Sequence, residues 1–271
     1  MREISVAVAQ FRIRYCDIHG NMTYVRRLVE QASSLGSTII VLPELWATGY
    51  CSELFRSISI EDTTRLIDEL RGLSKDYNIY IVGSVPEKTE DGLYNTGHII
   101  GPENSWFYRK AHLIRLLGEH EYFKPGSEGV LVANTRIGRL GIAICYDIRF
   151  PEYIRLYALR NAEILLVPAE WPLERIEHWR LLLRARAIEN QFYVLASNTI
   201  GDHKGVVYGG HSAIVDPWGE VVLEAGSRNE ALLVSILDLD RVSSIRDKLP
   251  LLSDRRRDLY RILDIRDGKN Y

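Results

Sequence analysis

Three polar residues that could do chemistry come at the ends of apolar segments typical of buried strands: Glu44, Lys110 and Cys145. In sheets of α/β proteins, functional groups collect at such strand ends. Each residue alone also has an ordinary explanation, since the glutamate could form an ion pair, the lysine could be a surface charge and the cysteine could be an inert buried thiol. Only the combination of the three indicates a catalytic site.

Cys145 is the most informative of these residues because it lies between an apolar strand and the helix that Pro151 is expected to begin. Strand-to-helix turns of this kind present nucleophiles. A free thiol has a pKa near about 8.5, so it needs a base or a cation to react at neutral pH. The Glu44 carboxylate could take the thiol proton, and the Lys110 ammonium could stabilise negative charge.

The elements that must position these residues are predicted from hydrophobic periodicity, β-branched runs and turn residues. The first half is expected to contain two helices and five or six strands, with helices at 25–35 and 61–77, buried strands at 4–9, 39–42 and 79–82, and a hairpin over 94–110. The second half repeats the pattern, with helices after 151 and at 175–190, and strands at 129–135, 139–144, 164–167, 192–196, 212–215, 220–223 and 231–236. This arrangement predicts two sheets packed face to face with helices outside.

Three segments of the sequence resemble the signature stretches of the nitrilase superfamily of carbon-nitrogen hydrolases. They read VLPELWATGY around Glu44, FYRKAHL around Lys110 and GIAICYDIRFPE around Cys145. The similarity continues through HWRLLLRARAIENQFYV and GGHSAIVDPWGEVV to RRRDLY, so it covers nearly the whole chain. The resemblance implies a four-layer α-β-β-α sandwich, a Glu-Lys-Cys triad that needs no cofactor, and symmetric association of subunits.

The resemblance also implies a second glutamate ahead of a Pro-Gly pair, and GEHEYFKPG places it at Glu119, with Glu121 as the competing residue. The stretch from Lys110 to Glu119 is short compared with the ω-amidase branch, which the sequence resembles most in its C-Y-D-x-R-F segment. Because this loop shapes the pocket, the identity of the substrate stays open.

Three further residues are candidates for substrate binding. Arg149 stands four residues after the cysteine. The sequence resembles related amidases and carbamoylases that recognise carboxylates in having an arginine at this position. A guanidinium can hold a carboxylate through two hydrogen bonds. The alternative is a structural ion pair with Asp147 or Glu152. Trp171 is expected to form a pocket wall or part of the core, and the backbone N–H of Tyr146 is expected to help bind the oxyanion.

These observations predict a cysteine-dependent amidohydrolase that converts a small amide to ammonia and a carboxylic acid through a thioester. An ω-amide of a dicarboxylic acid is the first expectation for the substrate, an N-carbamoyl compound the second and a nitrile the third. A non-catalytic scaffold or a thiol redox sensor is the alternative from another class.

Composition and residue spacing argue against several other classes of protein. The 34 basic and 36 acidic residues give a formal charge of -2, which argues against a nucleic-acid partner. The seven histidines lack metal-ligand spacing, so no metal is expected. The resemblance to the nitrilase superfamily implies that no cofactor is needed. No apolar run reaches the roughly 20 residues of a membrane span.

Three cysteines without C-x-x-C spacing indicate neither a disulfide framework nor a zinc site, and a cytoplasmic location is expected. The chain is predicted to form one domain over 1–249, followed by a tail at 250–271 that packs on a partner subunit. A homodimer or a higher homo-oligomer is expected, because the helices after 151 and at 175–190 carry apolar residues on more than one face.

Overall fold

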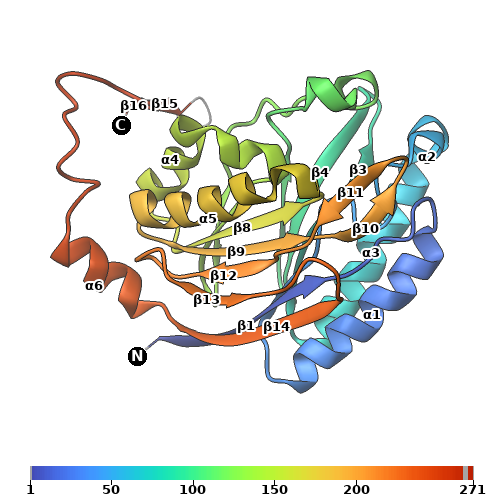
Figure 1. Cartoon of the computed structure of the whole chain (residues 1–271), viewed down its shortest axis with the longest axis horizontal. Helices are drawn as coiled ribbons and strands as arrows, with labels where there is room; N and C mark the ends of the chain where they lie inside the picture. Colours follow the sequence, from blue (N-terminus) through green and yellow to red (C-terminus); the bar gives the residue numbers. More distant parts are fainter. Residues whose placement is uncertain (1, 265–267, 271) are drawn as a thin grey trace.

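The computed structural model describes residues 2–264 and 268–270 of the chain and confirms the predicted α-β-β-α sandwich (Figure 1). Two six-stranded sheets lie face to face. The strands of the first sheet are, in spatial order, β14 (Ala231–Asp238), β1 (Glu3–Gln10), β2 (Ile39–Val41), β3 (Tyr80–Lys88), β4 (Leu93–Ile100) and β5 (Ser105–Arg109). Those of the second are β13 (Val221–Glu224), β12 (Ala213–Val215), β9 (Tyr193–Asn198), β8 (Ile164–Ala169), β7 (Gly138–Ile142) and β6 (Val132–Thr135).

The long helices form the two outer layers, as Figure 1 shows. The first sheet is covered by α1 (Ile18–Ser34) and α3 (Ile60–Tyr77), and the second by α4 (Pro151–Leu159) and α5 (Ile176–Asn190). Successive side chains of a strand point to opposite faces of its sheet. On β1, Ala7 and Ala9 therefore pack against α1 and α3, whereas Val6 and Val8 belong to the core between the sheets.

Each sheet has a parallel centre and antiparallel edges. In the first sheet β2 pairs in parallel with β1 and β3, and in the second β8 pairs in parallel with β7 and β9. The carboxyl ends of β2 and β8 meet between the sheets, where the backbone N–H of Glu44 donates to the carbonyl of Ala169 at 3.4 Å. The two sheets together therefore bring several strand ends to one place.

The sequence patterns did not predict several short elements. They are α2 (Ser52–Ser57), β10 (Ile200–His203), β11 (Val206–Gly209), α6 (Asp240–Lys248), β15 (Leu263–Asp264) and β16 (Lys269–Asn270). A helix of six or nine residues is too short to form on its own propensity, so tertiary contacts decide it. Within the described residues, no helix combines the length and the apolar character needed to cross a bilayer.

The tail after residue 249 leaves α6 and runs toward α4 (Figure 1). The side chain of Gln191 donates to the carbonyl of Leu249 at 2.6 Å, and Leu252 and Ile262 contact the main core. Leu259 and Tyr260 remain exposed. The predicted domain boundary at 249 and the packing of the tail on a partner stay predictions, and residues 265–267 and 271 of that tail lie outside the described residues.

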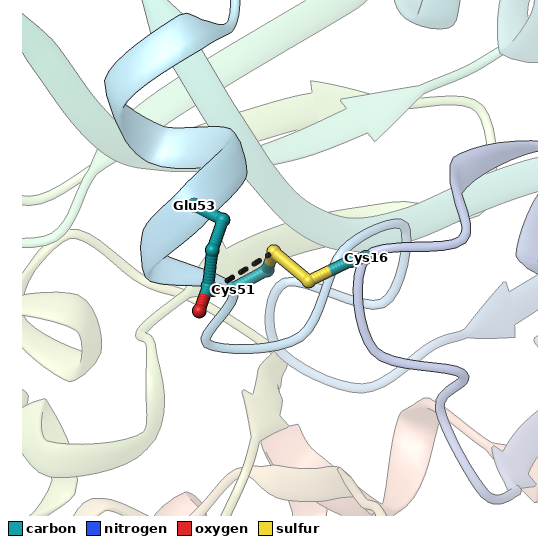
Figure 2. Close-up of side chains that lie close together, drawn as sticks. All are labelled: Cys16, Cys51 and Glu53. Carbon is teal, nitrogen blue, oxygen red and sulfur yellow. Dashed lines mark hydrogen bonds between the residues drawn. A yellow bond between two sulfur atoms is a disulfide. The ribbon is translucent and has the colours of Figure 1, made fainter.

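The prediction of unpaired cysteines was wrong, because a disulfide joins Cys16 to Cys51 (Figure 2). Cys16 lies in the loop after β1 and Cys51 precedes α2, so a separation of 35 residues hid the pairing from the sequence pattern. Glu53 lies beside the two sulfurs, but the sulfurs are bonded to each other and offer no thiolates to a metal ion. Cys145 is a free, buried thiol.

The disulfide should contribute measurably to stability because it closes a loop of 35 residues. Chain-entropy arguments give about 3–4 kcal/mol for a loop of this length. We expect dithiothreitol to lower the free energy of unfolding in urea by about this amount. A Cys16→Ser/Cys51→Ser variant is the control and should not respond to the reductant. Alkylation of all three cysteines in unfolded, unreduced protein would contradict the pairing.

Candidate active site

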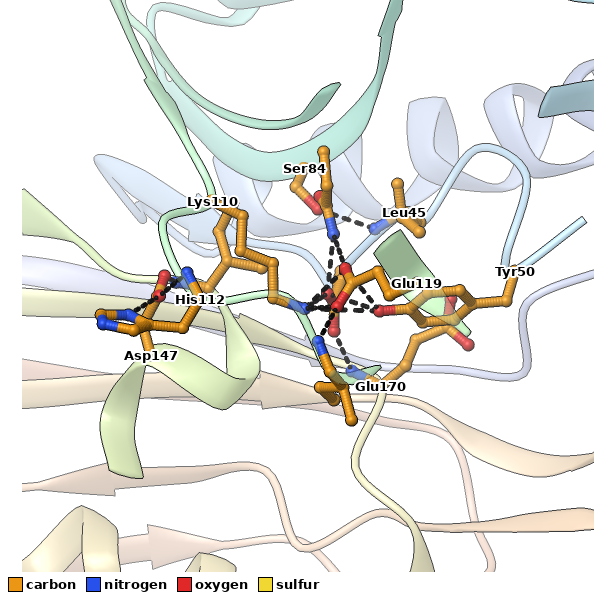
Figure 3. Close-up of polar contacts among 12 residues, drawn as sticks. Leu45, Tyr50, Ser84, Lys110, His112, Glu119, Asp147 and Glu170 are labelled. Carbon is orange, nitrogen blue, oxygen red and sulfur yellow. Dashed lines mark hydrogen bonds and ion pairs between the residues drawn. The ribbon is translucent and has the colours of Figure 1, made fainter. Parts of the chain in front are cut away.

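A buried lysine between two buried glutamates forms the centre of the candidate site (Figure 3). Lys110 Nζ lies 2.8 Å from Glu44 Oε1 and 2.8 Å from Glu119 Oε1, and its distance to Glu119 Oε2 is 3.0 Å. All three side chains are fully removed from solvent. One ammonium thus faces two carboxylates in a medium where charges interact strongly.

Glu44 follows β2, and its two oxygens accept bonds from different parts of the chain. Oε1 accepts from Asn95 Nδ2 at 2.8 Å and from the Tyr50 hydroxyl at 3.0 Å, and Oε2 accepts from the backbone N–H of Glu170 at 3.0 Å. The next residue, Leu45, has a φ of 44° and donates its N–H to Ser84 Oγ. This turn directs the carboxylate into the space between the sheets.

Lys110 follows β5, and backbone bonds to two different segments hold it. Its N–H donates to the carbonyl of Asn95 at 2.9 Å, and its carbonyl accepts from the N–H of Gly126 at 2.8 Å. Burial alone would lower the pKa of Lys110, but Glu119 and Glu44 raise it above its ordinary value. Lys110 therefore keeps its proton and acts as a fixed positive charge.

The structure favours Glu119 over Glu121 as the second glutamate. Glu119 is 1% exposed, and its Oε2 accepts from the backbone N–H of Ile114 at 2.8 Å. Its Oε1 also lies 3.2 Å from the Tyr50 hydroxyl and 3.3 Å from Asn95 Nδ2. Glu121 is exposed. The short stretch after Lys110 is long enough to return Glu119 to the ammonium.

Cys145 opens a short 3-10 turn, Cys145–Arg149, which begins shortly after β7 ends at Ile142. Its φ of 45° is unusual for a residue with a side chain and marks a sharp turn between strand and helix. Asp147 holds this turn, since Oδ2 accepts from the N–H of Ile144 at 3.0 Å and from the Tyr108 hydroxyl at 2.8 Å. Asp147 Oδ1 also pairs with the His112 ring at 2.7 Å.

The Cys145 thiol shares its surroundings with the charged cluster. Burial raises its pKa well above the usual range, the charge of Glu44 raises it further, and the charge of Lys110 acts in the opposite direction. The sulfur therefore rests as a neutral thiol beside a carboxylate that can accept its proton.

Cys145 lies at the wall of a cavity of about 440 Å³ that is also lined by all three predicted substrate-binding residues, Tyr146, Arg149 and Trp171. The residues lining it are Leu113, Ile114, Arg115, Leu116, Cys145, Tyr146, Arg149, Trp171, Pro172, Arg175 and His178. Trp171 is 2% exposed, which makes it both a core residue and a pocket wall. Its backbone N–H donates to Asn198 Oδ1, and its indole N–H donates to the carbonyl of Arg175. These two hydrogen bonds hold the ring in place.

The Arg149 guanidinium lies over the Trp171 ring, 4.4 Å from its centroid, and 3.5 Å from His178 Nδ1. The alternative was a structural ion pair with Asp147 or Glu152. Tyr108, His112 and the Ile144 N–H use the Asp147 carboxylate instead. Within the described part of the chain, Arg149 forms no ion pair. Its charge is free to meet a ligand in the cavity.

Three residues of the site were not predicted from the sequence: Tyr50, Asn95 and Glu170. Tyr50 lies inside the signature stretch around Glu44, so its position there was an available signal. Asn95 lies within β4 and Glu170 directly follows β8, and no local sequence pattern marks either residue. Burial and the charge of Glu44 raise the pKa of Glu170 well above its usual range, which keeps this carboxyl group neutral.

Removing the lysine should destabilise the fold, since it leaves two buried carboxylates without a counter-charge. We expect Lys110→Met to lower the free energy of unfolding in urea by about 3–5 kcal/mol. Lys110→Met/Glu119→Gln should recover part of this loss because one of the two charges is gone. Lys75→Met, at an exposed lysine of α3, is the control and should change stability by less than about 0.5 kcal/mol. A Lys110→Met protein as stable as the control would show that the ammonium does not balance the cluster.

Comparison with known proteins agrees with the geometry. Residues 5–247 match the family described as Carbon-nitrogen hydrolase. The 2-oxoglutaramate amidase of Bacillus subtilis (strain 168) is 39% identical over 259 residues, which cover 94% of this chain and 99% of that protein. Omega-amidase NIT2 of Mus musculus is 35% identical over 254 residues, covering 89% of this chain and 91% of the relative.

Solved structures show the same architecture. A CN-hydrolase superfamily protein from Xanthomonas campestris, with an arsenic adduct in its active site, superposes with a TM-score of 0.87 at 29% identity and covers 94% of this chain and 98% of its own. An amidase from Nesterenkonia sp. AN1, in which acrylamide has added to the active site cysteine, gives a TM-score of 0.85 at 28% identity over the same shares of the two chains.

Proposed function

The chain belongs to the carbon-nitrogen hydrolase family and is a hydrolase of carbon-nitrogen bonds other than peptide bonds, and we propose that its substrates are small amides that carry a carboxylate at the far end. The observation that carries this proposal is the Arg149 guanidinium, which lies in the cavity that Cys145 borders and forms no ion pair with any residue the structure describes. The names of the amidase relatives, which refer to ω-amides and to 2-oxoglutaramate, support the same substrate class.

In the proposed reaction, Glu44 accepts the thiol proton while the Cys145 sulfur attacks the amide carbon. The carbonyl oxygen becomes an oxyanion, which the Lys110 ammonium and the backbone N–H of Tyr146 stabilise. Glu44 then gives the proton to the amide nitrogen, the carbon-nitrogen bond breaks and ammonia leaves. A thioester remains on Cys145.

The second half of the reaction consumes water. Glu44 takes a proton from a water molecule, and the resulting hydroxide attacks the thioester carbon. The carbon-sulfur bond breaks, the proton returns to the sulfur and a carboxylic acid leaves. Glu119, which shares Lys110 and Tyr50 with Glu44, positions the ammonium and orients the substrate or the water.

The nucleophile can be tested directly. Cys145→Ala should fold normally, because alanine fits a small buried turn, and should lose turnover. Cys16→Ala/Cys51→Ala should keep most of its activity at a temperature where it remains folded. Iodoacetamide that inactivates the native protein should label Cys145 in peptide maps, and activity that survives in Cys145→Ala would refute the assignment.

The role of Arg149 can be tested with paired substrates. Arg149→Lys should lower kcat/KM for a monoamide of a dicarboxylic acid by about 10- to 150-fold, because an ammonium cannot form the bidentate pair of hydrogen bonds that a guanidinium forms with a carboxylate. A neutral amide of similar length should lose far less. Equal losses for both substrates would mean that Arg149 only supports the turn after Cys145.

Two alternatives of the same chemistry are an N-carbamoyl compound and a nitrile, and ammonia release from a panel of amides, carbamoyl compounds and nitriles distinguishes them. A redox sensor would need a second thiol close to Cys145, but Cys16 and Cys51 are bonded to each other. A non-catalytic scaffold would not need the full set of Glu44, Lys110 and Cys145.

We also propose that the chain forms a homodimer or a higher homo-oligomer. Exposed apolar residues on α5 and on the tail support this, among them Leu181, Ile188, Leu259 and Tyr260. The tail at 250–271 would then pack on the partner subunit. A mass near the monomer's 31.1 kDa in light scattering at micromolar concentration would contradict association.

The cytoplasmic location remains a prediction. It was argued from cysteines without a disulfide pattern, and the disulfide between Cys16 and Cys51 removes that argument.

A further inference from the structure

We propose that Arg175 is the second arm of a two-arginine clamp, which holds the distal carboxylate of the substrate together with Arg149. This inference rests on the proposed function and adds a specificity-determining residue that the sequence analysis did not identify. In the clamp, each guanidinium donates to the same carboxylate, so that the far end of a short amide is fixed while its carbonyl carbon lies near Cys145.

The position of Arg175 supports the clamp. Arg175 immediately precedes α5 and lines the same cavity as Arg149 and Cys145. Its carbonyl accepts a hydrogen bond from the Trp171 indole nitrogen at 2.8 Å. The Arg149 guanidinium lies over the ring of that same tryptophan, 4.4 Å from its centroid. One buried aromatic residue therefore holds the backbone of Arg175 and packs against the guanidinium of Arg149.

The electrostatics of this cavity favour an anion. Its described lining contains three arginines, Arg115, Arg149 and Arg175, and no acidic side chain. Burial lowers the pKa of Arg149, and the positive charge of Arg175 lowers it further. Two like charges that face one cavity repel each other, and a carboxylate between them would remove that repulsion. The other titratable side chains near Arg149 are those of Cys145, Tyr146 and His178, and none of them is a carboxylate.

Arg175 forms an ion pair with a neighbouring carboxylate of the same chain. Its Nη1 lies 3.0 Å from Oε1 of Glu174, and the glutamate side chain is 71% exposed. An exposed pair of this kind is weak, so a substrate carboxylate can replace Glu174 at little cost. Glu174 is therefore expected to compete with the substrate for Arg175, and its removal should have the opposite effect from removal of the arginine.

The test compares two substrates of equal length, butyramide and succinamate, in which a carboxylate replaces the terminal methyl group. Arg175→Gln should raise KM for succinamate by about 10- to 100-fold with little change in kcat, and leave butyramide unchanged. Glu174→Gln should lower KM for succinamate by about 2- to 5-fold and also leave butyramide unchanged. Arg180→Gln, at an exposed arginine of α5 that pairs with Glu224 outside the cavity, is the matched control.

A second measurement separates direct contact from long-range attraction. If Arg175 only attracts anions to the cavity, the loss in Arg175→Gln should vanish in 0.5 M salt, where the Debye length is roughly 4 Å. A loss that persists in salt, together with the opposite effect of Glu174→Gln, supports the clamp. An unchanged KM for succinamate in Arg175→Gln, or a loss that salt abolishes, overturns it.

The outcome for the wild-type protein separates this inference from the proposed function. A wild-type protein that hydrolyses butyramide as well as succinamate would contradict the proposed substrate class itself. A wild-type protein that prefers succinamate, and keeps that preference in Arg175→Gln, would leave the proposed function intact and refute the clamp alone.

Discussion

One ammonium ion buried between two carboxylates is the interaction on which the rest of this structure depends. Lys110, Glu44 and Glu119 are all inaccessible to solvent, and a buried charge without its partners is strongly destabilising. Each of the three must therefore arrive with its counter-charge and its hydrogen bonds already in place. The fold meets this requirement by ending β2 and β5 at the same point and by returning the segment after Lys110 to the ammonium.

The same constraint explains the neutral groups around the cluster. The cluster carries one positive and two negative charges, so a further anion beside it is disfavoured. Burial and the nearby carboxylates raise the pKa values of Cys145, Glu170 and Tyr50, and all three stay protonated. A neutral thiol next to a carboxylate is suited to a reaction in which proton transfer and attack on a carbonyl carbon occur together. The positive charges of Arg149 and Arg175 lie at the cavity that Cys145 borders, where we propose that they bind a substrate carboxylate.

The sequence predicted the charged groups of the site better than the groups that hold them. Glu44, Lys110 and Cys145 follow apolar strands, which is a local pattern, and family resemblance supplied Glu119. Asn95 and Glu170 carry no such pattern, because their roles arise only when the two sheets meet. The disulfide between Cys16 and Cys51 was missed for the same reason, since the two loops that it joins are neighbours only in the folded chain. Long helices and central strands were predicted well, whereas α2, α6 and the β10–β11 hairpin depend on tertiary contacts.

The central claim is that an amide is hydrolysed through a thioester on Cys145, and product partitioning tests it most directly. Hydrolysis of succinamate and of the monomethyl ester of succinic acid in the presence of hydroxylamine would be followed by measuring both the hydroxamate and succinic acid. A shared thioester predicts the same ratio of hydroxamate to acid from both substrates, because ammonia or methanol has already left when hydroxylamine competes with water. A ratio that depends on the leaving group would contradict a common acyl-enzyme and with it the proposed role of Cys145.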